Sequence, residues 1–341
     1  MFRHAPSPPP IAEPVARRAT GRAAADRIGP LQRALTARLG AGTVRALHRE
    51  HLGLDLAATA GPIALLVAIA AWIGTGTLPW PAEAALVAVN GWLLTAIALV
   101  AHDVAVHRMR WGRRGSWVHA AIAFALVLAP GTGYARAHTR HHARLGSDQD
   151  AEAYKMRLVT PARRWWYATL PGVLQMTRTR AGGDGPSYLS IPEGDVAGRR
   201  RLAAERVLLA VLLGGAAALA LAGHARAVLL GWVLPLLVVA PALNAMRIVL
   251  EHAEADDASL AWLGTWYRCG PVTRALFLAD SGDCHIVHHV FPRIPFYRCA
   301  RAADLIAPWL AEQGLRERRS FWALMKGWFV DGHAHRTVWP R

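Results

Sequence analysis

Histidines at regular spacings are the clearest candidates for a chemical function in this chain. Residues 285–289 read HIVHH and residues 138–142 read HTRHH, so both boxes place histidines at i, i+3 and i+4. On a helix these positions share one face, which predicts that the three imidazoles of each box converge on a single point. A looser HxxxxH pair precedes the boxes. The eight histidines are His102, His107, His138, His141, His142, His285, His288 and His289.

Neutral imidazole is a common ligand for iron, zinc, copper and nickel. A lone histidine is usually a surface residue or a satisfied core residue, but three spaced groups in a hydrophobic chain favour metal binding. Cys284 directly precedes the last box, and the chain has two further cysteines, Cys269 and Cys299. Three cysteines form neither a disulfide framework nor a CxxC site, so we interpret them as reduced thiols on a cytosolic face.

The composition of the chain indicates a membrane protein. Of its 341 residues, 53% are hydrophobic, 14 are tryptophan, and the mean hydropathy is +0.20. The formal net charge is +16. Nucleic-acid binding is one interpretation of such a charge, but arginines crowded into particular connections favour the positive-inside rule instead. We therefore expect no nucleic-acid partner.

Four apolar stretches reach the length of roughly 20 residues that a membrane span requires. They cover about residues 56–74, 82–101, 202–222 and 227–250. A shorter apolar stretch at 118–129 suggests an interfacial or re-entrant segment. Residues 1–30 predict a disordered basic, proline-rich tail or, less readily, a targeting segment. Residues 31–51 predict a basic amphipathic helix on the membrane surface. We expect a single domain at residues 31–310, followed by a cytosolic C-terminal tail at residues 311–341.

The placement of arginine predicts the orientation of these spans. The turn at 74–82 has no Lys or Arg and the turn at 223–226 has one, whereas the connection at 102–200 is strongly basic. Both termini and both long connections are therefore expected in the cytosol, with the chain in a bacterial inner membrane. Every box histidine, together with His252, then lies on one side of the membrane. The expected fold is all-α, with four transmembrane helices and a cytosolic helical cap that carries two metals of four or five ligands each.

The three boxes, in this order and between these spans, resemble those of the membrane fatty acid desaturase and hydroxylase superfamily. The segment after the last box, FPRIPFY at 291–297, is also similar, and the resemblance covers about residues 50–310. It implies a non-haem di-iron centre that uses O2, with the eight box histidines as ligands and His252 completing the set.

Acidic residues near the boxes are candidates for orienting the imidazoles through their second ring nitrogen. Asp103, Glu251 and Asp283 stand beside box residues or His252 in the sequence, and we favour Glu251 and Asp283. Asp148, Asp150 and Asp280 are weaker candidates. Many desaturases have neutral residues before the last box, whereas DSGD stands at 280–283 here, so the substrate and the reaction outcome stay open.

Four candidate functions are compatible with histidine boxes of this kind. The resemblance favours a desaturase of a fatty acyl chain or related lipid, and a hydroxylase or ketolase could use the same metals. A non-catalytic metal or haem protein is a more distant alternative. A zinc hydrolase is disfavoured because HExxH is absent and nine histidines exceed the needs of a zinc site. No electron-transfer module is recognisable, so we expect a separate donor such as a ferredoxin, a rubredoxin or a cytochrome b5-like protein on the basic face.

Overall fold

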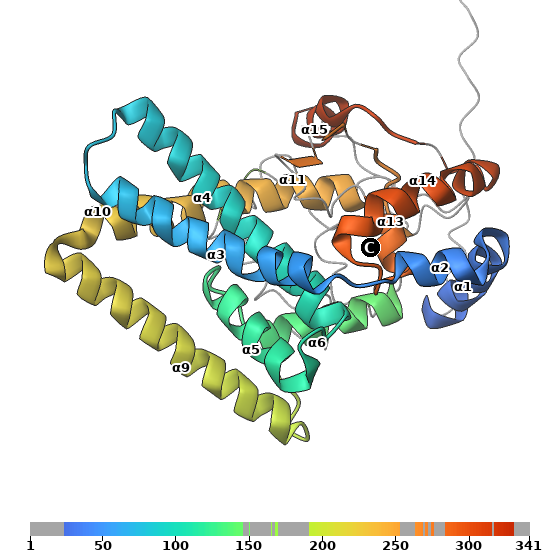
Figure 1. Ribbon diagram of the computed structural model, residues 1–341, viewed down its shortest axis with the longest axis horizontal. Helices are drawn as coiled ribbons and strands as arrows, with labels where there is room; N and C mark the ends of the chain where they lie inside the picture. Colours follow the sequence, from blue (N-terminus) through green and yellow to red (C-terminus); the bar gives the residue numbers. More distant parts are fainter. Residues whose placement is uncertain are drawn as a thin grey trace, which may run out of the picture.

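A computed structural model describes residues 24–145, 150, 165, 168–169, 191–252, 263–268, 270–271, 274–275, 284–315 and 317–330. Apart from an isolated bridge between Tyr267 and Arg318, the regular elements in these ranges are helices (Figure 1). The expectation of an all-α fold is therefore confirmed for the described part of the chain.

Two long apolar helices form the first hairpin of the bundle, α3 (Leu52–Gly74) and α4 (Trp80–Ala101). Each belongs to a stretch long and apolar enough to cross a membrane. Pro79 is the N-cap of α4, where a missing N–H costs nothing because the first amides of a helix have no intrahelical partner. The hairpin therefore turns sharply and sends α4 back along α3, toward the first histidine pair.

The third apolar stretch runs for 53 residues, from Val196 to Ile248. At 1.5 Å per residue it would be about 80 Å long as a straight helix, far more than the roughly 30 Å apolar core of a bilayer. Gly223 has a φ of 94° inside the stretch, a conformation that glycine adopts without strain. The chain reverses there, so that α9 (Val196–Leu219) forms one arm and residues 225–252 form the other (Figure 1).

The returning arm is built from α10 (Ala225–Val228), two π-helical turns at Leu229–Val233 and Pro235–Val239, and α11 (Ala240–His252). It packs against α3 and α4. A Cβ on Gly91 would lie 2.3 Å from Val239 Cβ, so only glycine allows this approach. The buried Asn90 side chain donates to Gly231 O at 2.6 Å. Three stretches thus qualify as membrane spans, and the expected count of four depends on whether the two arms cross separately.

The two tight turns lie together at one end of the bundle. Arg226 donates to Ile73 O at 3.2 Å and pairs with Glu83, which joins the turn of the second hairpin to that of the first. Histidine-bearing elements occupy the other end (Figure 1). The apolar window of the third stretch is not buried inside the protein, and Val207 and Val211 on α9 are exposed, as expected of a lipid-facing helix.

Helices α1 (Ala24–Leu39) and α2 (Ala41–Leu47) replace the expected amphipathic helix on the membrane surface. Their apolar side is buried within the protein, because Leu35 and Leu47 pack in one core with Ile286 and Val287. The amphipathic pattern was therefore correctly recognised, but its apolar side packs on the protein core and not on the membrane surface. α1 also begins inside the segment expected to be a disordered tail.

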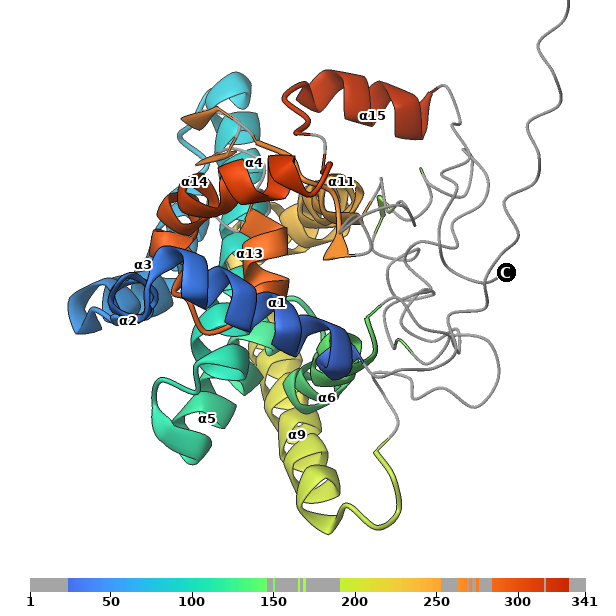
Figure 2. The same cartoon turned by 90° about the vertical axis from the view of Figure 1, so that its right-hand side faces the viewer.

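Short helices close the histidine end of the bundle. Helix α13 (His285–Val290) lies between α1, α11 and α14 (Phe296–Glu312), as Figure 2 shows. The apolar segment expected at the interface forms α5 (Gly112–Ala125), which packs against α6 (Gly131–Arg144) and α9. Within the expected C-terminal tail, α15 (Phe321–Phe329) packs on α11 through Phe321 and Met325.

Glu205 of α9 fixes the start of α6, the helix that carries the second box. Its buried carboxylate accepts hydrogen bonds from the Thr132 backbone N–H at 3.0 Å, from Thr132 Oγ1 and from Trp117 Nε1 at 2.9 Å. A carboxylate at a helix N-terminus satisfies amides without intrahelical partners and complements the helix dipole. The long apolar helix α9 therefore anchors the box helix directly.

Candidate metal centre

The first histidine pair lies on a π-helical turn, η1 (His102–His107), which continues α4. On an α-helix, residues five apart point about 140° away from each other, because each residue turns the helix by about 100°. The wider turn is marked by an i to i−5 hydrogen bond from Arg108 N to Asp103 O at 3.0 Å. It brings the ring centroids of His102 and His107 to 4.7 Å and their Nε2 atoms to 3.0 Å.

Five imidazoles form the first group, which we name the five-imidazole group. Its members are His102, His107, His138, His142 and His288, and their ligand atoms all lie within 4.8 Å of one another. The Nε2 atoms of neighbouring rings in this group are close together. The separation is 2.8 Å between His102 and His138 and 3.0 Å between His138 and His142. His288 closes the group from α13, with its Nε2 3.0 Å from that of His142.

Three buried imidazoles form the second group, which we name the three-imidazole group. It consists of His141, His285 and His289, again with ligand atoms within 4.8 Å of one another. The Nε2 atoms of His285 and His289 are 2.8 Å apart. The two groups are adjacent, because the ring centroids of His142 and His289 are separated by 4.7 Å.

Each HxxHH box is divided between the two groups, so the expectation that the three imidazoles of a box converge on one point was wrong. His138 and His142 belong to one group and His141 to the other. Relative to residue i, residue i+4 lies at about +40° around the helix and i+3 at about −60°. The two adjacent histidines of a box therefore diverge by about 100°. The third box divides in the same way, with His288 separated from the other two.

The donor sets of both groups fit a metal ion. Two imidazole nitrogens bound at about 2.0–2.1 Å and at right angles to one ion lie about 3 Å apart, close to the Nε2 separations of 2.8–3.0 Å. Burial, reinforced by neighbouring imidazoles, holds the pKa of His138 and of His288 well below the usual value. Both rings are therefore neutral, the form in which imidazole binds metals.

Asp150 is the acid that orients a box imidazole most directly. Its buried carboxylate accepts from His141 Nδ1, with oxygen distances of 2.8 and 3.0 Å. A hydrogen on Nδ1 leaves Nε2 as the lone-pair nitrogen, directed at the three-imidazole group. Asp150 was a weaker candidate in the sequence analysis because it does not stand next to a box residue.

Other acids near the boxes are placed differently. Glu251 Oε1 is 3.7 Å from His285 Nδ1, too far for a hydrogen bond, and accepts from Arg247 at 2.6 Å. The Asp103 carboxylate is directed at Arg108 instead of an imidazole. Asp148, Asp280 and Asp283 lie outside the described residues. His252 is the last residue of α11, and its side chain is likewise outside the described part.

Tyr134 is a neighbour of the histidines that sequence reasoning missed. Its ring stacks on that of His138, with centroids 5.4 Å apart and planes 5° apart, and meets His102 edge to face at 6.1 Å. Tyr134 and His138 are four residues apart on α6, so they share one face of the helix. That spacing was a usable signal. Cys284 and Cys299, by contrast, are buried.

A comparison with known families assigns the chain. The model of the family described as fatty acid desaturase matches residues 76–321, which includes all three histidine boxes. The chain belongs to the fatty acid desaturase family. No curated protein matches the sequence.

Proposed function

We propose that this protein is an O2-dependent, di-iron membrane oxidoreductase that introduces a double bond into a fatty acyl chain or a related lipid. The observation that carries this proposal is the meeting of eight box imidazoles, from three separate elements, in two adjacent groups. Membership of the fatty acid desaturase family supports the oxidoreductase class.

Each group would hold one iron. His102, His107, His138, His142 and His288 would bind the first, and His141, His285 and His289, with His252 as a further ligand, the second. Bound iron would supply O2 activation and the removal of hydrogen from an unactivated methylene, which side chains cannot achieve alone. The chain contributes the positions of the rings, the neutral state of His138 and His288, and the His141 tautomer set by Asp150.

The proposed topology has four spans, with both termini and the metal centre in the cytosol beneath a bacterial inner membrane. The basic connection at 102–200 and the arginine-poor turns support this orientation. Electrons would arrive from a separate acidic carrier, such as a ferredoxin, a rubredoxin or a cytochrome b5-like protein, attracted by the basic face.

The proposal is tested by expressing the full chain in a host membrane and measuring both iron and products. Purified protein should contain two non-haem irons per chain, and mass spectrometry of host lipids should find acyl chains that have lost two hydrogens. Gain of oxygen would indicate a hydroxylase or ketolase instead. Haem, or no iron after iron-replete expression, would overturn the enzyme proposal altogether.

A further inference from the structure

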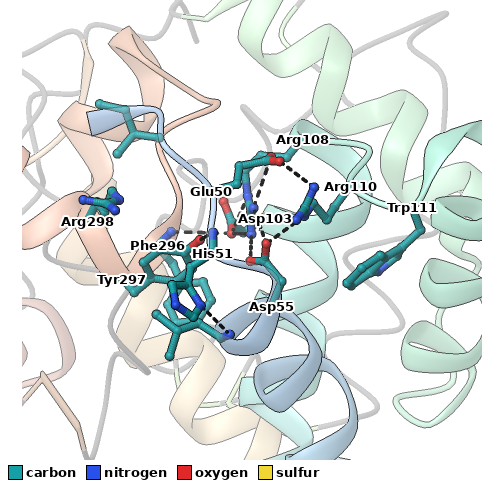
Figure 3. A network of polar contacts seen from close by, with 12 residues as sticks. Glu50, His51, Asp55, Asp103, Arg108, Arg110, Trp111, Phe296, Tyr297 and Arg298 are labelled. Carbon is teal, nitrogen blue, oxygen red and sulfur yellow. Dashed lines mark hydrogen bonds and ion pairs between the residues drawn. The ribbon is translucent and has the colours of Figure 1, made fainter. Parts of the chain in front are cut away.

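A buried ion-pair network includes Asp103, the residue that follows His102 in η1 (Figure 3). At its centre is Arg108, whose side chain is only 1% exposed. Its guanidinium donates to Asp55 Oδ1 at 2.7 Å and Oδ2 at 3.2 Å, and to Asp103 Oδ2 at 2.8 and 3.1 Å. Glu50 and Arg110 close the outer side of the network.

The network joins three elements that meet near the histidines. Asp55 is in the first turn of α3, and its side chain is fully buried. Asp103 lies inside η1, directly after His102. The same Asp103 oxygen also faces the Phe296 N–H, at 3.4 Å, where α14 begins after the third box. Asp55 thereby connects the first transmembrane stretch to the turn that presents His102 and His107.

The backbone of this turn adopts an unfavourable geometry that needs support. Helical residues rarely use i to i−5 hydrogen bonds. The chain leaves η1 through Met109, a non-glycine residue with a φ of 48°. Such conformations persist only where surrounding contacts over-determine them. Arg108 lies between the π turn and Met109, and its five donor contacts within the network hold it in place.

We propose that Asp55 and Arg108 are positioning residues for the five-imidazole group. Asp55 binds Arg108, and Arg108 binds Asp103. These contacts hold the π turn that lets His102 and His107 face the same ion. An α-helical turn at the same place would direct one of the two rings away. This inference depends on the proposed metal centre but adds a claim of its own: the network supports one group and leaves the other intact.

The test is Asp55→Asn in the full-length, detergent-purified protein, titrated with Co2+ as a coloured probe. Asn keeps the shape of Asp55 but presents an NH2 group to a guanidinium that needs an acceptor. His107→Ala and His285→Ala provide reference spectra for loss of the five-imidazole and three-imidazole groups respectively. Glu83→Gln is the matched control, because it removes the acidic partner of Arg226 at the opposite end of the bundle.

Asp55→Asn should weaken binding of one Co2+ by about 10–100-fold, the usual effect of losing support around a ligand. Its remaining spectrum should match that of His107→Ala, while Glu83→Gln should bind both ions normally. If Asp55→Asn does not fold, Arg108→Lys should give the same one-site loss, because an ammonium cannot bridge two carboxylates as a planar guanidinium does.

Three outcomes would overturn the inference. One is normal binding of both ions by a folded Asp55→Asn or Arg108→Lys protein. Another is equal weakening of both ions, which would indicate general destabilisation. A wild-type protein that binds no metal would overturn the proposed function as well, whereas wild-type binding of two ions with unaffected variants would overturn only this inference.

Discussion

His142 Nε2 lies 3.0 Å from His288 Nε2, although the two residues are 146 positions apart in the chain. This contact joins the second box on α6 to the third box on α13 and completes the five-imidazole group. In the proposed centre, the second and third boxes would therefore supply ligands to the same metal ion.

Replacing His288 should therefore affect the five-imidazole group selectively. We expect His288→Ala to lose product formation and to retain about half of the wild-type iron, because the three-imidazole group does not include this ring. Iron analysis and product mass spectrometry measure both effects. The exposed His224, in the turn at the other end of the bundle, provides the control His224→Ala. Normal turnover in His288→Ala would remove the residue from the site.

Asp150 should control metal affinity through His141. Asp150→Asn keeps the size of the side chain but weakens the preference for hydrogen on Nδ1, so affinity at the three-imidazole group should fall about 10–100-fold. A Co2+ titration measures this change. Asp304→Asn, which alters an exposed acid on α14, should leave both affinities unchanged. Loss at the five-imidazole group alone would contradict the assignment.

His252 remains a predicted ligand of the second iron. If it completes that site, His252→Ala should lower iron occupancy in purified protein without removing the chain from the membrane. His119→Ala is a suitable comparison, since His119 is buried in α5 and belongs to neither group. Full occupancy in His252→Ala would strike the residue from the ligand set.

Glu205 should stabilise the start of α6. Glu205→Gln replaces charge-assisted hydrogen bonds to Thr132 and Trp117 by weaker ones, and we expect a loss of about 1.5–3 kcal/mol. Thermal unfolding in detergent measures the loss. The exposed Glu193, just before α9, gives the control Glu193→Gln, which should unfold like the wild type. Equal melting of all three proteins would show that Glu205 does not anchor the helix.

The metal-free protein should lose stability as the pH falls below about 6.5, the usual pKa of histidine. Burial lowers the pKa of His138 and His288 in the folded state, so the unfolded chain binds more protons over this range and is favoured by acid. The melting temperature should therefore rise from pH 5 to pH 7. Replacing His138 by Gln should flatten this dependence. A melting temperature that increases on acidification would contradict neutral, buried rings.

Much of the site was predictable because metal ligation requires particular residue types at helical spacings. The boxes identified all eight histidines that the structure brings together, and hydropathy located the apolar stretches that deliver them to one end of the bundle. The amphipathic pattern of residues 31–51 was also correct, but such a pattern cannot distinguish a membrane surface from a protein core. The burial of this apolar side against α13 could therefore be learned only from the structure.

The order of the amino acids alone shows which imidazoles are available and that they come from three places in the chain. The division of these imidazoles between two groups emerges in the folded protein, because angles around a helix separate the adjacent histidines of each box. The folded protein also shows that His102 and His107 face one another. Their spacing requires a π turn, which the local sequence pattern does not predict. The choice of Asp150 over Asp103 has the same origin: a hydrogen-bond partner is selected by distance in space, and in this fold Arg108 lies within reach of Asp103.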